Sequence, residues 1–145
     1  MPPSLAEVLK REVEDSFMRG LYAAVAYYEG SWQEDKKGDG GRSWSTFQIH
    51  DHWHPREVDY MGKNWSDYST SLKAFRMVLD KQKQWTPSQD IHTRLAYYNE
   101  GSSWSKPKGQ EYADRIIKLA HELQPLLLCV KETDAGKLKK IKKNE

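Results

Sequence analysis

The chain has 145 residues, which is enough for one compact domain with a hydrophobic core and too few for two well-filled ones. Its 23 basic and 21 acidic residues leave a net charge of only +2, so no strong overall field draws it to nucleic acid or to a membrane surface. The single cysteine, Cys129, rules out an internal disulfide, and its apolar neighbours predict a buried, inert thiol. We expect one domain over residues 1–130 and a basic, flexible tail over residues 131–145.

Membrane and export signals are missing from the sequence. No apolar run is long enough to span a bilayer, and the opening segment MPPSLAEVLKREVED is acidic and amphipathic, unlike a signal peptide. We therefore expect no membrane span and no signal peptide in this chain.

The first third of the chain predicts two helices. A capping box followed by apolar residues at helical spacing predicts a helix over about residues 4–18, which Gly20 should break. The mostly apolar segment over residues 21–29 predicts a second, largely buried helix. Its last turn carries Glu29, and Gly30 is a natural stop.

Little helix is predicted between residues 30 and 66. Residues 30–41 are polar and glycine-rich, which is typical of a loop or hairpin tip. Residues 42–50 alternate apolar and polar side chains imperfectly, which predicts a short irregular strand or extended turn. Residues 52–69 carry no clear period, so we expect a loop with one helical turn.

Helical patterns return in the second half. An apolar stripe predicts a helix from about residue 67 to about residue 84. Thr86, with Pro87 at the first helical position, predicts the start of the next helix, which Gly101 should end.

After a loop, residues 110–128 predict a last long helix that Pro125 should kink or end. The predicted fold class is therefore mainly α, with a small β-hairpin or irregular extended segment after the second helix.

Glu29 is the candidate for chemistry. A carboxyl at a helix C-terminus faces the negative end of the macrodipole, and Tyr28 and Trp32 could remove water from it. Both effects disfavour the carboxylate and raise the pKa, which suits a general acid that protonates a glycosidic oxygen. A solvent-facing glutamate at a helix end is the commoner alternative, and the residues alone weigh the two evenly.

Other polar and aromatic side chains are candidates for substrate binding. The amides of Gln48 and Asn99 and the phenol of Tyr98 can bond N-acetyl and hydroxyl groups, although either amide could instead brace the hairpin or a helix end. Aromatic faces can cover sugar rings. We expect a groove lined by Trp32, Trp44 and Trp104, and packing roles for Trp53, Trp65 and Trp85.

Three segments, YYEGSW, GDGGRSWSTFQI and AYYNEG, resemble motifs of lytic transglycosylases and goose-type lysozymes, the peptidoglycan-cleaving branch of the lysozyme-like fold. The resemblance covers about residues 21–123. It implies that Glu29 is the catalytic acid and that Ser31 replaces the serine that usually follows it directly. Asp39 resembles the aspartate that precedes the glutamine-containing segment in goose-type lysozymes, and Ser-Thr-Phe over residues 45–47 replaces the usual Gly-Leu-Met.

The resemblance implies cleavage of the β-1,4 bond between N-acetylmuramic acid and N-acetylglucosamine. A second carboxylate, with Asp39 ahead of Glu34 and Asp35, would serve hydrolysis. Lytic transglycosylases need none, because the N-acetyl group of the substrate assists and the muramyl 6-hydroxyl attacks to give a 1,6-anhydro product. The implied partner is the peptidoglycan glycan strand. The protein would act on it at the cell wall, either in the periplasm, outside the cell or as part of a virion. We expect it to be a monomer and to need no cofactor.

Other interpretations stay open. The chain could be a non-catalytic glycan-binding or structural module, a hydrolase of chitin-like polymers, or a nucleic-acid-binding domain, although the net charge is poor support for the last. His50, His52 and His54 alternate on an extended segment and could bind a metal ion together, but no fourth ligand is evident. We expect no metal site and place these histidines at the edge of the cleft.

Overall fold

The computed structural model describes residues 1–86 and 90–129. Over these residues the chain forms six α-helices and a small three-stranded antiparallel sheet, joined by loops and short 3₁₀ turns. The predicted fold class, mainly α with a small β segment after the second helix, is confirmed. The elements are α1 (Pro3–Glu12), α2 (Ser16–Gly30), β1 (Lys37–Gly38), β2 (Ser43–Trp44), β3 (Ile49–His50), α3 (Pro55–Met61), α4 (Tyr68–Lys81), α5 (Ile91–Glu100) and α6 (Pro107–Leu123).

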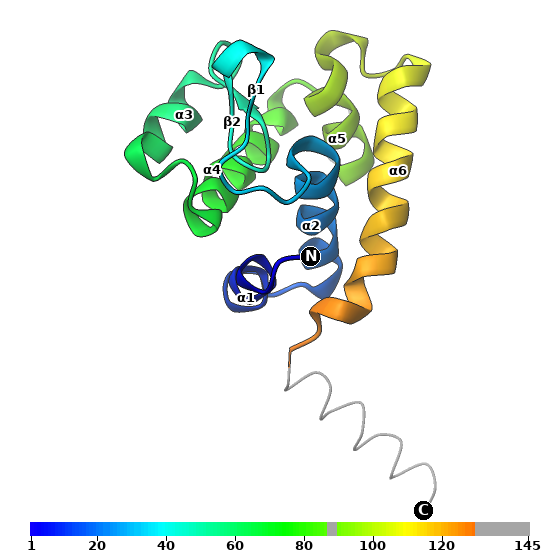
Figure 1. Ribbon diagram of the computed structural model, residues 1–145. Coiled ribbons are helices and arrows are strands. Elements are labelled where there is room, and N and C mark those ends of the chain that lie inside the picture. Colours follow the sequence, from blue (N-terminus) through cyan, green and yellow to red (C-terminus); the bar gives the residue numbers. More distant parts are fainter. Residues whose placement is uncertain (87–89, 130–145) are drawn as a thin grey trace, which may run out of the picture.

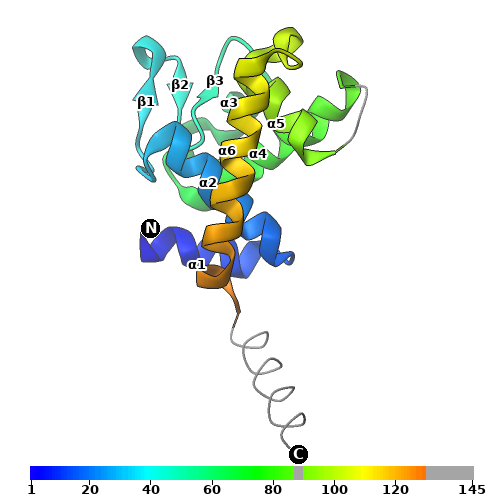
Figure 2. The same cartoon turned by 90° about the vertical axis from the view of Figure 1, so that its right-hand side faces the viewer.

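Helix α2 is the central element of the fold. Figure 1 shows α6 along one side of α2 and the sheet with α3 on the other, while α1 lies across its beginning. Figure 2 shows α6 from its own side, with α2 beside it. Every residue from 19 to 26 is buried, so this helix is enclosed on nearly all sides as its apolar sequence predicts.

The first helix is shorter than predicted, and Gly20 does not break it. Helix α1 ends at Glu12, and Asp15 starts α2 by accepting a hydrogen bond from the Met18 amide at 2.9 Å. Gly20 lies inside α2, where an added Cβ would come within 2.3 Å of the Ala120 carbonyl oxygen of α6. The glycine is therefore explained by the close approach of two helices, which local sequence does not reveal.

A buried arginine satisfies the backbone at the break between α1 and α2. The guanidinium of Arg19 donates to the carbonyl oxygens of Val13 at 2.6 Å and Glu14 at 2.8 Å, and to that of Leu127 at 3.2 Å. Its side chain thereby joins this corner to the 3₁₀ turn that follows α6. These charge-assisted bonds compensate for burying a cation.

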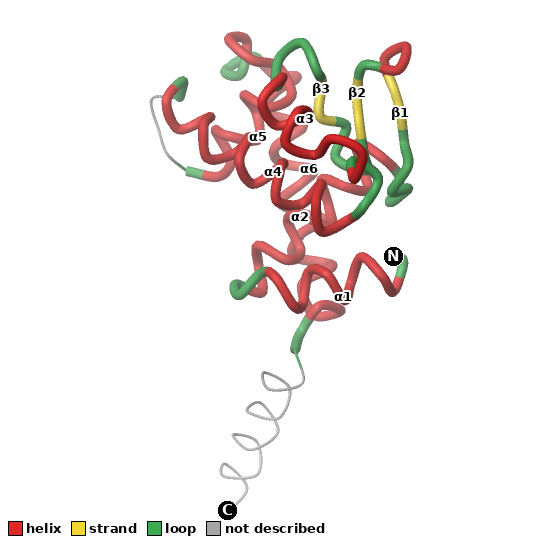
Figure 3. Tube along the Cα trace, turned by 90° about the vertical axis from the view of Figure 1, so that its left-hand side faces the viewer, coloured by secondary structure: helices red, strands yellow, loops and turns green. Residues whose placement is uncertain are grey.

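The sheet is short and sits against the end of α2. Strand β2 is central, with Lys37 opposite Trp44 on one side and Trp44 opposite Ile49 on the other. Ile49 and Phe47 are fully buried, and the Phe47 ring stacks on Phe75 of α4 with 4.8 Å between centroids. Figure 3 shows the sheet and α3 from their own side of the molecule.

The helices of the second half largely follow the sequence. Asp67 caps α4, which ends in a 3₁₀ turn over Gln82–Gln84, and α5 ends at Gly101 with a φ of 57°, as predicted. Helix α3, with two turns, is longer than the single turn that we expected.

The predicted start of α5 is wrong. This helix begins at Ile91, because Asp90 accepts from the Thr93 amide at 2.8 Å, whereas Thr86 donates its hydroxyl to the carbonyl of Gln82. Pro87 lies outside the described residues.

The end of the described chain differs from expectation at one residue. Helix α6 stops at Leu123 and passes into a 3₁₀ turn that contains Pro125, as predicted. Cys129 is partly exposed rather than buried, because it lies beyond that turn with its Sγ 3.6 Å from the Lys10 carbonyl oxygen. The tail predicted over residues 131–145 lies outside the described residues. None of the helices described is long and apolar enough to cross a membrane.

Replacing Gly20 with alanine should destabilise the protein. In an ordinary helix the change would favour folding by about 1 kcal/mol, but here the new Cβ overlaps the α6 backbone, and overpacking of this kind costs about 1–3 kcal/mol. Urea unfolding measures the effect. Lys118→Ala, at an exposed position of α6, should change the free energy of unfolding by less than about 0.5 kcal/mol. A Gly20→Ala protein as stable as the wild type would contradict this packing.

Candidate active site

A cleft of about 1120 Å³ opens beside the C-terminal end of α2. Its walls come from the sheet, the start of α3, and the C-terminal ends of α4 and α5, so segments far apart in the sequence meet there. The predicted site residues that line it are Glu29, Asp39, Gln48, Tyr98 and Asn99; those that do not are Ser31, Trp32 and Trp44.

Glu29 lies on the last turn of α2, as predicted, and its carboxyl is held by α6. Its Oε1 accepts a hydrogen bond from the Tyr112 hydroxyl at 2.8 Å. Burial is the main cause of a raised pKa for this carboxyl; the Tyr112 bond opposes the rise, and the negative charge of Asp39 adds to it. The sequence also predicted a raised pKa for Glu29, but from the helix end and from Tyr28 and Trp32 rather than from the groups named here.

Tyrosines from the second half of the chain surround Glu29. Tyr28, expected to shield it, is 46% exposed, whereas burial and the charge of Glu29 raise the pKa values of Tyr98 and Tyr112 well above the usual range. Both phenols therefore stay protonated and can donate hydrogen bonds. Tyr112 was not predicted as a site residue, because its place in the helical pattern of α6 is that of a core residue.

The end of α2 touches the turn between β2 and β3 directly. A Cβ at Gly30 would lie 2.3 Å from the Thr46 carbonyl oxygen, and the Thr46 hydroxyl donates to the Ala26 carbonyl at 3.3 Å. This contact fixes Glu29 relative to the sheet. Ser31 follows with a φ of 52° as the C-cap, exposed and outside the cleft, so its role is to end the helix.

Of the three candidate second carboxylates, only Asp39 lines the cleft with Glu29. It is exposed, with a φ of 50°, and its Oδ2 accepts from the Ser43 hydroxyl at 2.5 Å. Glu34 and Asp35 lie nearer to Tyr68, whose pKa is raised by burial and by their charges. Asp39 as the second carboxylate stays a prediction, and of the three candidates it is the one that shares the cleft with Glu29.

Of the residues predicted to bind substrate through polar groups, two bond the backbone of the sheet region and one is exposed in the cleft. Gln48 donates its amide to the carbonyls of Ser45 at 2.7 Å and Lys36 at 3.1 Å, which braces the hairpin, and Tyr98 donates to the Phe47 carbonyl at 2.7 Å. Both also line the cleft. Asn99 is exposed on its wall and free to reach a ligand.

The expected roles of the tryptophans are largely reversed. Trp32 packs on Tyr27 and donates its indole N–H to the Ala23 carbonyl at 2.8 Å, and Trp104 packs against the core. Trp44 packs edge-on against Trp65 with 5.2 Å between centroids.

Trp53 and Trp85 line the cleft instead, and they are 69% and 61% exposed. Distance along the chain from a motif does not show which way a side chain faces. Trp65 alone takes the packing role that we expected.

A polar cluster that lines the cleft was not predicted from the sequence. Glu57 is 3% exposed and pairs with Lys81 at 2.9 Å. His54 is buried with its ring stacked on Tyr98, and burial together with the Lys81 charge lowers its pKa to about 4, so the imidazole is neutral above that pH. No signal in the sequence pairs Glu57 with a lysine 24 residues away.

The histidines do not gather into a ligand set in the described residues. His50 and His54 line the cleft, whereas His52 is exposed outside it. Over residues 1–86 and 90–129, no group of three or more histidine, cysteine, aspartate or glutamate side chains is placed to hold a metal ion.

Comparison with known proteins gave no match to a family model, to a curated protein or to a solved structure. The likeness to lysozyme-like enzymes therefore depends on the three sequence segments.

Removing the Tyr112 hydroxyl should raise the pKa of Glu29 further. Tyr112→Phe keeps the ring that buries the carboxyl and deletes the hydrogen bond that, among the described residues, favours the carboxylate. NMR titration of the Glu29 side-chain carbon measures the change. Tyr27→Phe, at an exposed ring, should leave the value unchanged. An unchanged or lower pKa in Tyr112→Phe would show that the bond does not act on the charged form.

Glu29→Gln should stabilise the protein increasingly as the pH rises. Because the folded-state pKa is raised above the usual 4.5, ionisation of Glu29 opposes folding; this cost is absent well below pH 4.5, grows as the pH rises from 4.5 to the raised value, and is constant above it. The glutamine keeps the shape and removes the charge. Urea unfolding of both proteins from about pH 4 to about pH 8 tests this. A stability difference that does not vary with pH would contradict it.

Proposed function

We propose that this chain is a peptidoglycan-cleaving glycosidase of the lysozyme-like type, which acts on the β-1,4 bond between N-acetylmuramic acid and N-acetylglucosamine. The observation that carries the proposal is the Glu29 carboxyl, which sits at the end of a buried helix, lines an open cleft and has a pKa raised by burial. The three sequence segments that resemble lytic transglycosylases and goose-type lysozymes support the same assignment.

In the proposed reaction Glu29 acts first as an acid and then as a base. Its proton passes to the glycosidic oxygen while the bond from that oxygen to the anomeric carbon breaks. The resulting carboxylate then takes a proton from the attacking hydroxyl. The Tyr112 hydroxyl, 2.8 Å from Oε1, holds the carboxyl in one orientation and stabilises it once it is charged.

The second group in the reaction is either Asp39 or the substrate itself. Asp39 lines the same cleft and is oriented by Ser43, which suits a carboxylate that directs a water molecule. In the alternative, the N-acetyl group of the substrate assists and its 6-hydroxyl attacks, and Asp39 is then dispensable.

The rest of the cleft fits a chain of sugars. Trp53 and Trp85 offer exposed indole faces at its walls, and indoles stack on the apolar faces of sugar rings. Asn99 offers an amide for hydroxyl or N-acetyl groups. A volume of about 1120 Å³ accommodates several rings, which supports a polymeric glycan, met at the cell wall, as the substrate.

The decisive test is release of muropeptides from purified peptidoglycan by Glu29→Gln and the wild type. Loss of a general acid reduces the rate about 100-fold or more, so we expect release to fall to background while the helical circular dichroism stays the same. Glu34→Gln, a carboxylate outside the cleft, is the matched control and should retain activity. Activity retained by Glu29→Gln would overturn the assignment. Binding to sacculi without fragment release by the wild type would indicate a non-catalytic module.

Mass spectrometry of the products separates the two reaction types. Reducing ends that disappear in Asp39→Asn would indicate hydrolysis directed by Asp39. Anhydro ends that persist in Asp39→Asn would indicate transfer to the 6-hydroxyl. Release from chitin but not from peptidoglycan would point to a different glycan substrate.

A further inference from the structure

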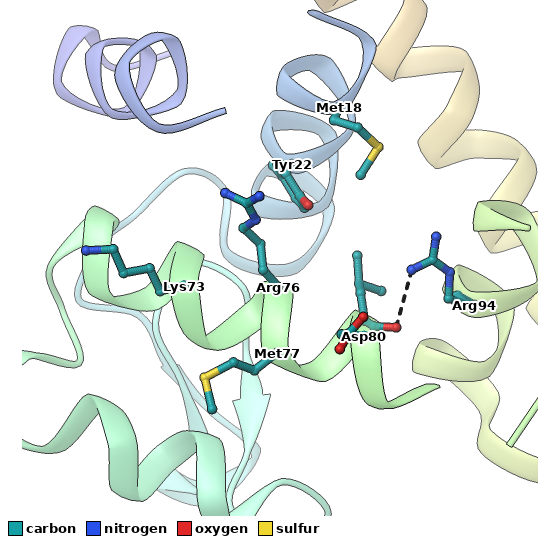
Figure 4. Close-up of a pocket in the computed structure, with 8 residues that line it drawn as sticks. Met18, Tyr22, Lys73, Arg76, Met77, Asp80 and Arg94 are labelled. Carbon is teal, nitrogen blue, oxygen red and sulfur yellow. Dashed lines mark hydrogen bonds between the residues drawn. The ribbon is translucent and has the colours of Figure 1, made fainter. Parts of the chain in front are cut away.

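A second groove, of about 450 Å³, lies between α2, α4 and the start of α5 and shares no residue with the cleft. Figure 4 shows Arg76 of α4 beside Tyr22 of α2 on one side of the groove and Arg94 of α5 on the other. Lys73 adds a third cation. The proposed glycosidase reaction gives these residues no role.

Arg94 has donor capacity that the protein does not use. Its Nη1 donates to the Leu79 carbonyl across a long 3.5 Å, drawn as the dashed line in Figure 4. Its Nε is buried and has no hydrogen-bond partner in the described part of the chain. Buried donors without partners are rare and costly, so each calls for an explanation, and a bound acceptor supplies one.

Tyr22 and Arg76 complete the donor set from the other side. Tyr22 is 6% exposed, and its hydroxyl oxygen points into the groove in Figure 4. The guanidinium carbon of Arg76 lies 5.9 Å from the Tyr22 ring, and one of its nitrogens donates to the Glu12 carbonyl at 3.2 Å. Burial raises the pKa of Tyr22, while the charges of Arg76 and Arg94 lower it, so both cations act on this phenol.

The nearby carboxylates do not neutralise the groove. Asp80 lines the groove and is paired with Lys83 at 3.0 Å, and the charge of Asp15 acts on the Tyr22 phenol. Glu12 lies 3.8 Å from the Lys73 ammonium and also pairs with Arg11 at 3.2 Å. The charged residues that line the groove are Lys73, Arg76 and Arg94 against Asp80, so the groove keeps a positive surplus.

We propose that this groove binds a phosphate group, either free or as the phosphodiester of an anionic polymer. Guanidinium groups match the oxygens of phosphate in geometry and charge. The donors come from three helices and approach from different sides, which suits the tetrahedral oxygens of phosphate better than the two coplanar oxygens of a carboxylate. The flexible side chains of Met18 and Met77 line the same groove and can adjust to whatever carries the phosphate.

The test is calorimetric titration of the full chain with inorganic phosphate and with poly(glycerol phosphate). We expect saturable binding that weakens about tenfold or more in Arg76→Gln and in Arg94→Gln, since each change removes a charge-assisted hydrogen bond. Arg94→Lys, which keeps the charge without the planar fork, should fall between the wild type and Arg94→Gln. Arg115→Gln, at an exposed arginine of α6, is the matched control and should bind like the wild type.

The two ligands separate the possible sources, because a polymer site binds poly(glycerol phosphate) more tightly and a small-anion site binds inorganic phosphate at least as tightly. No saturable binding, equal affinity for acetate, or equal loss in Arg115→Gln would overturn the proposal. Glu29→Gln should bind phosphate normally, so this result does not depend on the glycosidase assignment.

Discussion

The candidate site depends on one backbone contact, between Gly30 at the end of α2 and Thr46 in the turn of the sheet. With no side chain at residue 30, the helix end meets the turn directly, and an added Cβ would lie only 2.3 Å from the Thr46 oxygen. The same distance separates a Cβ at Gly20 from α6. Helix α2 is therefore fixed by one glycine against a helix and by another against the sheet. Glu29 is held between them, and its position relative to Asp39 follows from the rigidity of both contacts.

The surroundings of Glu29 make its ionisation costly. A carboxyl that is partly buried beside two phenols and within the field of another carboxylate is costly to ionise. Such an arrangement reduces the stability of the ionised protein at neutral pH, and a purely structural role would be served as well by a glutamine. Within the described part of the chain, the compensating hydrogen bond comes from Tyr112, 83 residues away. Strain of this kind is commonly concentrated at functional sites.

Sequence patterns predicted what local physics controls. The stripe of α4, the stop at Gly101 and the acid at the end of α2 follow from periodicity and capping, which act within a few residues. Gly20 was misjudged because its reason is a neighbouring helix. Trp44 and Trp53 were assigned the wrong way round because proximity to a motif does not fix side-chain direction. The Glu57–Lys81 pair and the partner of Glu29 required three-dimensional contacts that no single-sequence pattern carries.

The bonds of Arg19 have a consequence for how the chain folds. This side chain reaches Leu127, 108 residues further along, while its other donors hold the corner before α2. The bonds to Val13 and Glu14 are local, whereas the bond to Leu127 forms only when the last described turn is in place. Contacts of such long sequence separation are slow to form, since the entropy of closing the loop must be overcome first. During synthesis the central helix α2 therefore stays incompletely enclosed until nearly the whole described chain has left the ribosome.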